Sequence, residues 1–273
     1  MKFCMMSYTM ARRPDLFSVK GMLDLTCELG LEGIDFVTLH DTPAAELKRL
    51  ADDYGLTVAC HTFMADLTSS DASERQPGID AVKQGIENAV ILGTDRVMIP
   101  TPGKMGQPRE VTRRNIIAAL QSVAEFAQQA GVTLTVENFP GANSPFVIAD
   151  DVLEAIREVP GMGLTFDNGN VFTGGEDPAQ SFQRCATHVV HAHFKDWHLA
   201  DENTGFLCLD GRYYRGGLIG EGIVDQVSCL KAMQQAGYQD FINIEYEGNL
   251  YTPAEATRKA LEYLREQLAA LTA

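Results

Sequence analysis

The chain has 273 residues, of which 45% are hydrophobic and 22% are charged, and its formal net charge is −15. This composition is ordinary for a globular protein, but the acidic excess repels phosphate backbones, so we expect no nucleic-acid partner. The apolar runs all fall short of the roughly 20 residues needed to cross a bilayer, so we expect no membrane partner either.

The N-terminal residues, MKFCMMSYTMARRP, lack the apolar length and the small-residue cleavage site of a signal peptide, and we read them as a first strand. The six cysteines contain no CxxC pair. This spacing argues against a disulfide framework and against a cysteine zinc site, so buried free thiols are the simpler reading. We therefore expect a reducing, cytoplasmic location.

Short apolar runs alternate with longer segments of helical spacing eight times along the chain, with no linker-like stretch between them. In residues 110–131, Ile116, Leu120 and Val123 recur on one helical face, and Gly131 follows as a C-cap. The pattern is typical of parallel strands joined by helices. The expected strands are Lys2–Ser7, Gly33–Thr38, Thr57–Phe63, Arg96–Thr101, Thr133–Asn138, Gly163–Asp167, Val189–Lys195 and Phe241–Glu245.

Eight such units can form a closed barrel or a doubly wound open sheet. An open dinucleotide-binding sheet would carry G-x-G-x-x-G after its first strand, where this chain has SYTMARRP, and the chain also lacks a P-loop. We therefore predict an α/β protein with a (β/α)8 TIM barrel, built as a single domain from residues 1–273.

The active sites of such barrels lie at the C-terminal ends of the strands. Strands five to eight end in VEN, FDNGN, HAHFKD and IEYEG, which place Glu137, Asp167, His193 and Glu245 there. A buried carboxylate without a partner costs several kcal/mol of desolvation. Since Lys195 is the one nearby cation for three carboxylates, structural ion pairs are the weaker reading and a divalent metal ion is the stronger one.

Mixed carboxylate and imidazole ligands suit Mn²⁺, Mg²⁺, Co²⁺ or Zn²⁺. His191 faces the same side of its strand as His193, but the residue nearer the strand end should reach the mouth. We therefore assign His193 to the metal. His191 is assigned to the barrel interior or to a hydrogen bond with one of the metal ligands. His61, at the end of strand three, either touches the substrate or is a satisfied, partly buried histidine.

The four motifs, in this order, resemble those of the xylose isomerase-like barrel superfamily, in particular its branch of ketose 3-epimerases and hydroxypyruvate isomerases. The resemblance extends from the first strand to the eighth helix. It implies one Mn²⁺, Mg²⁺ or Co²⁺ ion on Glu137, Asp167, His193 and Glu245, with the two glutamates as acid/base partners. It also implies a sugar isomerase or epimerase that moves a proton through an enediolate.

Three substrate contacts of the ketose 3-epimerases are replaced in this chain, by Asn143, Asn170 and Leu199. A free ketohexose is therefore not carried over as the substrate, and the sugar or sugar derivative stays unnamed. The residues expected to bind substrate are His61, Asn170, Lys195 and Trp197.

The segment Trp197–Gly220 connects strand seven to the next helix, and its length and glycines predict a mobile lid with few apolar anchors. Its residues 212–215, of sequence RYYR, could bind an acidic or phosphorylated sugar, or could form a dimer contact or plain surface. The sequence leaves open whether the protein is a homo-oligomer.

Two other activities remain open. A metal-dependent dehydratase or lyase acting on inositol- or shikimate-type intermediates would use the same barrel and ligands. A non-catalytic sugar-binding barrel would not need two glutamates around a metal. An endonuclease IV-type nuclease is disfavoured, because Asn170 stands where that enzyme has a histidine ligand and because the net charge repels DNA.

Overall fold

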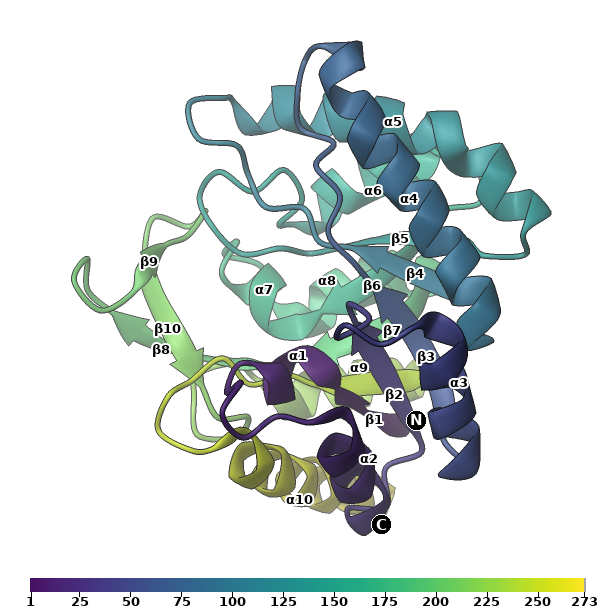
Figure 1. Ribbon diagram of the computed structural model, residues 1–273. Helices are drawn as coiled ribbons and strands as arrows, with labels where there is room; N and C mark the ends of the chain where they lie inside the picture. Colours follow the sequence, from purple (N-terminus) through teal and green to yellow (C-terminus); the bar gives the residue numbers. More distant parts are fainter. Residues whose placement is uncertain (273) are drawn as a thin grey trace.

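The computed structural model describes residues 1–272, in which eight parallel strands close into a barrel in the order β1-β11-β7-β6-β5-β4-β3-β2 (Figure 1). The predicted α/β class and (β/α)8 TIM barrel are therefore confirmed, while Ala273, the end of the predicted domain, lies outside the described residues. The barrel strands end within two residues of the expected positions: β1 Lys2–Met6, β2 Gly33–Val37, β3 Thr57–Thr62, β4 Arg96–Ile99, β5 Thr133–Glu137, β6 Gly163–Asp167, β7 Val189–Phe194 and β11 Phe241–Ile244.

Helices cover the outside of the barrel (Figure 1). In α5, the predicted face of Ile116, Leu120 and Val123 is buried, and the helix is followed by Gly131 at a φ of 70°, which an L side chain rarely adopts. The helices are α1 Ser7–Ala11, α2 Val19–Glu28, α3 Ala44–Asp53, α4 Ala72–Leu92, α5 Arg109–Gln129, α6 Ala149–Glu158, α7 Asn168–Phe172, α8 Pro178–Cys185, α9 Gln226–Gln235 and α10 Pro253–Thr272, with a short 3-10 helix, η1, at Ala186–His188.

Side chains alternate between the helix layer and the barrel interior along each strand. In β2, Ile34 and Phe36 join the main apolar core, whereas Asp35 between them contacts histidines of β7. In β5, Thr135 bonds to a threonine of β6 inside the barrel. The interior thus carries several polar groups, although the strands read as nearly continuous apolar runs.

The segment after β7 is an ordered substructure, so the expectation of a long loop with few apolar anchors is wrong. It forms a three-stranded antiparallel sheet in the order β8-β10-β9, from β8 Asp196–Ala200, β9 Phe206–Leu207 and β10 Tyr213–Gly217, which projects from one side of the barrel (Figure 1). Trp197, Cys208, Tyr214 and Val224 are buried together in a small core of their own. Local periodicity could not show this, because the core joins residues that are far apart in the sequence.

The carboxylate of Asp196 fastens this sheet to the turn that follows it. Its Oδ2 accepts hydrogen bonds from the backbone N–H groups of Gly220 and Gly222, at 3.0 and 3.1 Å. Its Oδ1 accepts from the backbone N–H groups of Trp197 and Val224, at 2.9 and 3.0 Å. A Cβ at Gly222 would lie 2.1 Å from Oδ1, so this close approach requires glycine.

All six cysteines are free within residues 1–272, and five are buried as expected. Cys27 is the exception, because it lies on the exposed side of α2. Over the same residues, no helix combines the length and the apolar character needed to cross a membrane.

Replacing Asp196 by alanine should loosen the β8-β10-β9 sheet while leaving the barrel folded. Hydrogen bonds to a charged group contribute about 1.5–3 kcal/mol each, so the free energy of local opening should fall by about 2 kcal/mol or more. Hydrogen exchange over residues 213–224 measures this. Asp201→Ala is the control, because the exposed Asp201 caps only its own turn through Asn203 and Thr204. Parental protection in Asp196→Ala would contradict the fastening role.

Candidate functional site

Four side chains from neighbouring strands meet at the C-terminal mouth of the barrel. Glu137 and Asp167 end β5 and β6, His193 lies near the end of β7, and Glu245 directly follows β11. Each offers one ligand atom, and these atoms all lie within 4.8 Å of one another. All four side chains are buried, with at most 4% of the residue surface exposed. The structure therefore brings the four predicted metal ligands together.

His193 and Lys195 link the carboxylates of this cluster. His193 Nδ1 lies 2.7 Å from Glu137 Oε1 and 3.5 Å from Glu245 Oε2. Lys195 Nζ lies 2.7 Å from Glu245 Oε1 and 3.7 Å from Asp167 Oδ2. Lys195 also pairs with Glu247 at 3.0 Å, so its single charge is divided among several carboxylates.

The excess negative charge shifts the pKa values of the cluster. Burial raises the pKa of Asp167 well above its usual range, and Lys195 offsets this only partly, while the charges of Glu137 and Glu245 raise it further. Burial also opposes ionisation of Glu245, but Lys195 and His193 outweigh burial and lower its pKa to about 2. Although burial opposes protonation of His193, the nearby carboxylates raise its pKa. Each shift reflects a site that attracts positive charge.

The donor set fits a divalent cation. Asp167 Oδ2 and Glu245 Oε2 are buried and have no hydrogen-bond partner among the described residues. Buried polar atoms are normally satisfied, and orphaned carboxylate oxygens in one cluster indicate a missing positive partner. Three carboxylates and one imidazole are ligands that Mn²⁺, Mg²⁺, Co²⁺ and Zn²⁺ accept.

A cavity of about 360 Å³ is lined by two residues of this cluster, Glu137 and Glu245. Glu137, Glu245 and Lys195 form part of its polar wall, with Tyr8 and Glu247 beside them. Tyr8 donates a hydrogen bond to Glu247 at 3.1 Å. The other residues that line the cavity are mostly apolar: Met6, Val37, Thr38, Thr62, Met64, Met98, Pro100, Phe139 and Pro140.

The predicted substrate contacts lie in three different environments. Lys195 lines the cavity, as a substrate contact would. The side-chain amide atoms of Asn170 and the indole Nε1 of Trp197 are buried and unpartnered among the described residues, but neither side chain lines the cavity. Asn170 is tied to the cluster through its backbone, because its N–H donates to Asp167 Oδ1 at 2.6 Å.

The expectation that His61 touches the substrate is not supported by its position. Thr62 lines the cavity, so the adjacent His61 faces the opposite side of β3. Its Nδ1 lies 3.0 Å from the carbonyl oxygen of Phe36, and its ring packs against Phe63. This is the alternative reading of His61, a buried histidine whose polar atom is satisfied.

Residues 212–215 do not contribute to the cavity either. Arg212 pairs with Asp210 at 2.8 Å and its side chain is 55% exposed. Tyr214 is buried in the core of the small sheet and donates to Asp210 at 2.6 Å. Neither arginine of this segment lines the cavity that the described residues form.

Sequence reasoning missed three residues near the site. Asp35 lies in the middle of β2, so a search confined to the strand ends does not find it. The available signal was a single carboxylate within the apolar run GIDFV. Tyr8 and Glu247 lie just beyond β1 and β11. They carried no signal, because an isolated tyrosine or glutamate after a strand is common on any surface.

Comparisons with known proteins agree with this architecture. An uncharacterised protein of Methanocaldococcus jannaschii is 25% identical over 238 residues, which cover 82% of this chain and 76% of that protein. An inosose dehydratase of Geobacillus thermodenitrificans is 22% identical over 258 residues, which cover 87% of this chain and 85% of the dehydratase.

Solved structures show the same fold at low sequence identity. L-ribulose 3-epimerase superposes with a TM-score of 0.79 at 19% identity, covering 99% of this chain and 95% of its own. The IOLI protein, solved with a bound zinc atom, superposes with a TM-score of 0.79 at 18% identity, covering 99% and 98%. A family model described as the xylose isomerase-like TIM barrel matches residues 23–267. The chain therefore belongs to the xylose isomerase-like TIM-barrel family, as its four strand-end motifs predicted.

Proposed function

We propose that this protein is a divalent-metal-dependent isomerase or epimerase of a sugar or sugar derivative. The observation that carries the proposal is the pair of glutamates, Glu137 and Glu245, which line one cavity and share one buried cluster with His193. A fold alone does not specify a reaction, but two carboxylates facing one substrate site can move a proton. The epimerases among the structural relatives support this choice.

Glu137, Asp167, His193 and Glu245 would hold the metal ion. A divalent ion bound there would supply Lewis-acid chemistry toward substrate oxygens and so make the adjacent carbon-bound proton acidic enough to move. The zinc reported for the IOLI relative supports a divalent ion, and we extend the proposal to Mn²⁺, Mg²⁺ and Co²⁺ because the cluster contains no thiolate.

The protein's own side chains divide the remaining work. One of the two glutamates, in its ionised form, takes the proton from the carbon next to the substrate carbonyl. The other glutamate, in its protonated form, gives a proton back: to the opposite face of the same carbon in an epimerisation, or to the neighbouring carbon in an isomerisation. Lys195 keeps Glu245 ionised through their 2.7 Å ion pair and can also donate to a substrate hydroxyl. The low exposure of all four cluster residues limits the access of water, which strengthens these interactions.

The charges around the cavity favour an uncharged substrate over an anionic one. Lys195 is the one cationic side chain that lines it among the described residues, and it already pairs with Glu245 and Glu247. A phosphate group would therefore enter a site of excess negative charge without a free cationic partner. The predicted cytoplasmic setting belongs to this proposal and is supported by the six free thiols.

A dehydratase is the second candidate, because the Geobacillus relative is named an inosose dehydratase and aligns with 87% of this chain. The same glutamates would remove a carbon-bound proton, but a hydroxyl group would then leave as water. Proton NMR of the reaction, with the mass of the product, separates the two candidates. Isomerisation or epimerisation conserves the mass of the substrate, whereas dehydration gives a product lighter by one water molecule.

We expect the purified protein to bind about one divalent ion per chain, and Glu245→Gln to bind it far more weakly. Loss of a residue that hydrogen-bonds to a metal ligand already lowers metal affinity by about 10- to 100-fold. Loss of a ligand itself should lower it further. Glu247→Gln is the matched control, because Glu247 also pairs with Lys195 but lies outside the four-residue cluster. Metal analysis after dialysis measures both variants. Full loading of Glu245→Gln would remove Glu245 from the proposed ligands.

With the true substrate in deuterated water, the product should carry deuterium at the reacting carbon. At saturating metal, Glu137→Gln should lower turnover by about 10²- to 10⁴-fold, since it removes a proton-transfer group, and chelation should abolish turnover. Proton NMR follows both exchange and conversion. Parental turnover in a fully metal-loaded Glu137→Gln variant would refute the acid/base pair.

Each candidate keto sugar should react better in its free form than as its phosphate ester. An unpaired charge in a buried site costs several kcal/mol, so kcat/KM for the ester should be lower by more than about 10-fold. Arg212→Ala and Arg215→Ala should leave this preference unchanged, because neither residue lines the cavity. A preference for the ester that either variant abolishes would show that the segment does bind phosphate.

A further inference from the structure

Asp35 is a further buried carboxylate of the barrel, in contact with His193 from the interior. It lies in the middle of β2 between Ile34 and Phe36, and it is fully buried. Its ionic contacts within residues 1–272 are two histidines, with no lysine or arginine in contact. An isolated buried carboxylate is costly, so the partners of Asp35 require an explanation.

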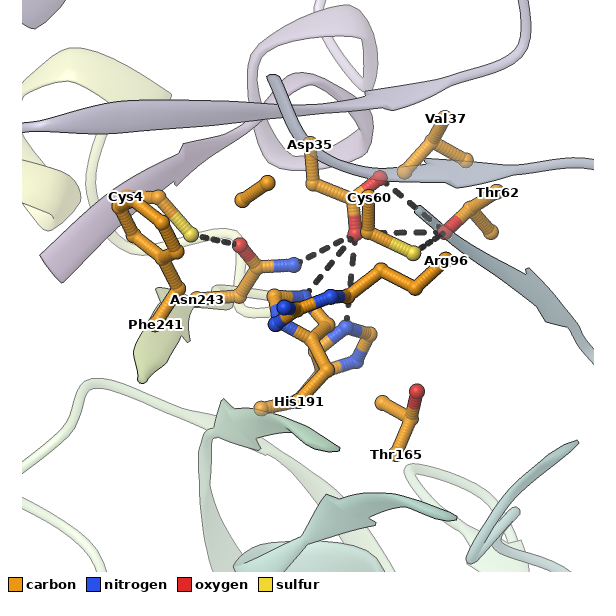
Figure 2. Close-up of polar contacts among 12 residues, drawn as sticks. Cys4, Asp35, Val37, Cys60, Thr62, Arg96, Thr165, His191, Phe241 and Asn243 are labelled. Carbon is orange, nitrogen blue, oxygen red and sulfur yellow. Dashed lines mark hydrogen bonds and ion pairs between the residues drawn. The ribbon is translucent and has the colours of Figure 1, made fainter. Parts of the chain in front are cut away.

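Two neutral groups donate hydrogen bonds to Asp35 (Figure 2). Thr62 Oγ1 lies 3.1 and 3.2 Å from its two oxygens, and Asn243 Nδ2 donates to Oδ2 at 2.7 Å. The amide of Asn243 is itself oriented, because its Oδ1 accepts from Cys4 Sγ. These contacts fix the carboxylate in place without neutralising its charge.

The two histidines of β7 approach the same carboxylate oxygen. His191 Nε2 and His193 Nε2 lie 3.5 and 3.6 Å from Asp35 Oδ2, and their rings stand at 87° to each other. Figure 2 shows His191 reaching Asp35 across the barrel interior. Both separations exceed those of a normal hydrogen bond, so the interaction is chiefly electrostatic, and the low dielectric of the interior strengthens it.

His193 therefore has a carboxylate near each of its nitrogens. Nδ1 lies 2.7 Å from Glu137 at the mouth, and Nε2 faces Asp35 in the interior. A neutral imidazole carries one proton, and the partner of one nitrogen decides which nitrogen holds it. A lone pair on either nitrogen would face a carboxylate, but a divalent ion bound among the carboxylates of the four-residue cluster would take the place of a proton on Nδ1. The one remaining proton then belongs on Nε2, where it faces Asp35. The lone pair of Nδ1 is then directed at the four-residue cluster.

We propose that Asp35 is a positioning residue for the metal centre, which holds the proton of His193 on Nε2 and so keeps Nδ1 free to bind the metal. The inference rests on the proposed function, because it requires the metal ion. A carboxylate behind a metal-binding histidine fixes its tautomer and orientation and raises its basicity as a ligand. Asp35 does this without lining the substrate cavity.

Long-range ¹H–¹⁵N NMR of the parent protein, labelled with ¹⁵N-histidine and titrated with zinc, tests the tautomer directly. The histidine whose signals move on zinc addition should show a protonated Nε2 and a zinc-bound Nδ1. Zinc bound through Nε2 would overturn the role of Asp35 and leave the metal centre standing. If no zinc binds, the proposed function fails together with this inference.

Asp35→Asn tests the consequence for affinity, because it removes the charge and nearly keeps the shape. We expect zinc affinity to fall by about 10- to 100-fold and His193 to become a mixture of tautomers. Thr135→Val is the matched control, because it removes a buried hydroxyl that bonds to Thr165 inside the same barrel. It should keep parental zinc affinity even if its Tm falls.

Two results with these variants would overturn the inference. One is parental zinc affinity and a parental tautomer in Asp35→Asn. The other is an equal loss of affinity in Asp35→Asn and Thr135→Val, which would mean that Asp35 acts only through general stability. If Asp35→Asn does not fold, the spectrum of the zinc-loaded parent still decides the question.

Discussion

The constraint on which the rest of this structure depends is the buried negative charge at the mouth of the barrel. Glu137, Asp167 and Glu245 occupy one site, and Lys195 is the one lysine or arginine in contact with it among the described residues. Burial disfavours ionisation of these groups and mutual repulsion adds to that cost, as the raised pKa of Asp167 reflects. Positive charge relieves this repulsion, whether it comes from bound protons or from the divalent ion proposed above.

The surrounding backbone is built to hold this cluster still. Asn168, Lys195 and Gln226 form a buried set in which the side chains of Asn168 and Gln226 bond to the backbone of Lys195, at 3.1 and 2.9 Å. Asn168 and Gln226 also bond to each other. The start of α7, the end of β7 and the start of α9 are thereby joined beneath the mouth. A side chain whose backbone is held in this way loses little conformational entropy when it binds a ligand.

The small β8-β10-β9 sheet extends this framework beyond the barrel. Asp196 follows Lys195 directly and anchors the turn around Gly222, while the ring of Trp197 lies 5.4 Å from Lys195 Nζ. The strand β8 therefore begins directly after Lys195, the residue whose charge is divided among the carboxylates. The sheet is thus connected to the site through Lys195, although residues 212–215 do not line the cavity.

The sequence by itself determined the strands, the barrel and the four residues at the mouth. Short apolar runs ending in Glu137, Asp167 or Glu245 carry this information locally, because parallel strands bring their C-terminal ends together whatever the details of packing. All strands except β6 were expected to end one or two residues too far along the chain, because the residue at which the ladder of hydrogen bonds stops is not encoded in the local pattern.

Only the tertiary structure decided the direction in which His61 faces, the sheet after β7 and the contacts of Asp35. The direction in which His61 faces depends on strand register, and a shift of one residue would reverse it. The β8-β10-β9 sheet depends on contacts between residues such as Trp197 and Tyr214, which no local pattern reveals. Asp35 contacts His191, His193 and Asn243, which lie more than 150 residues away in the chain. A buried carboxylate acquires a function from the charges around it, and those charges come together only when the barrel closes.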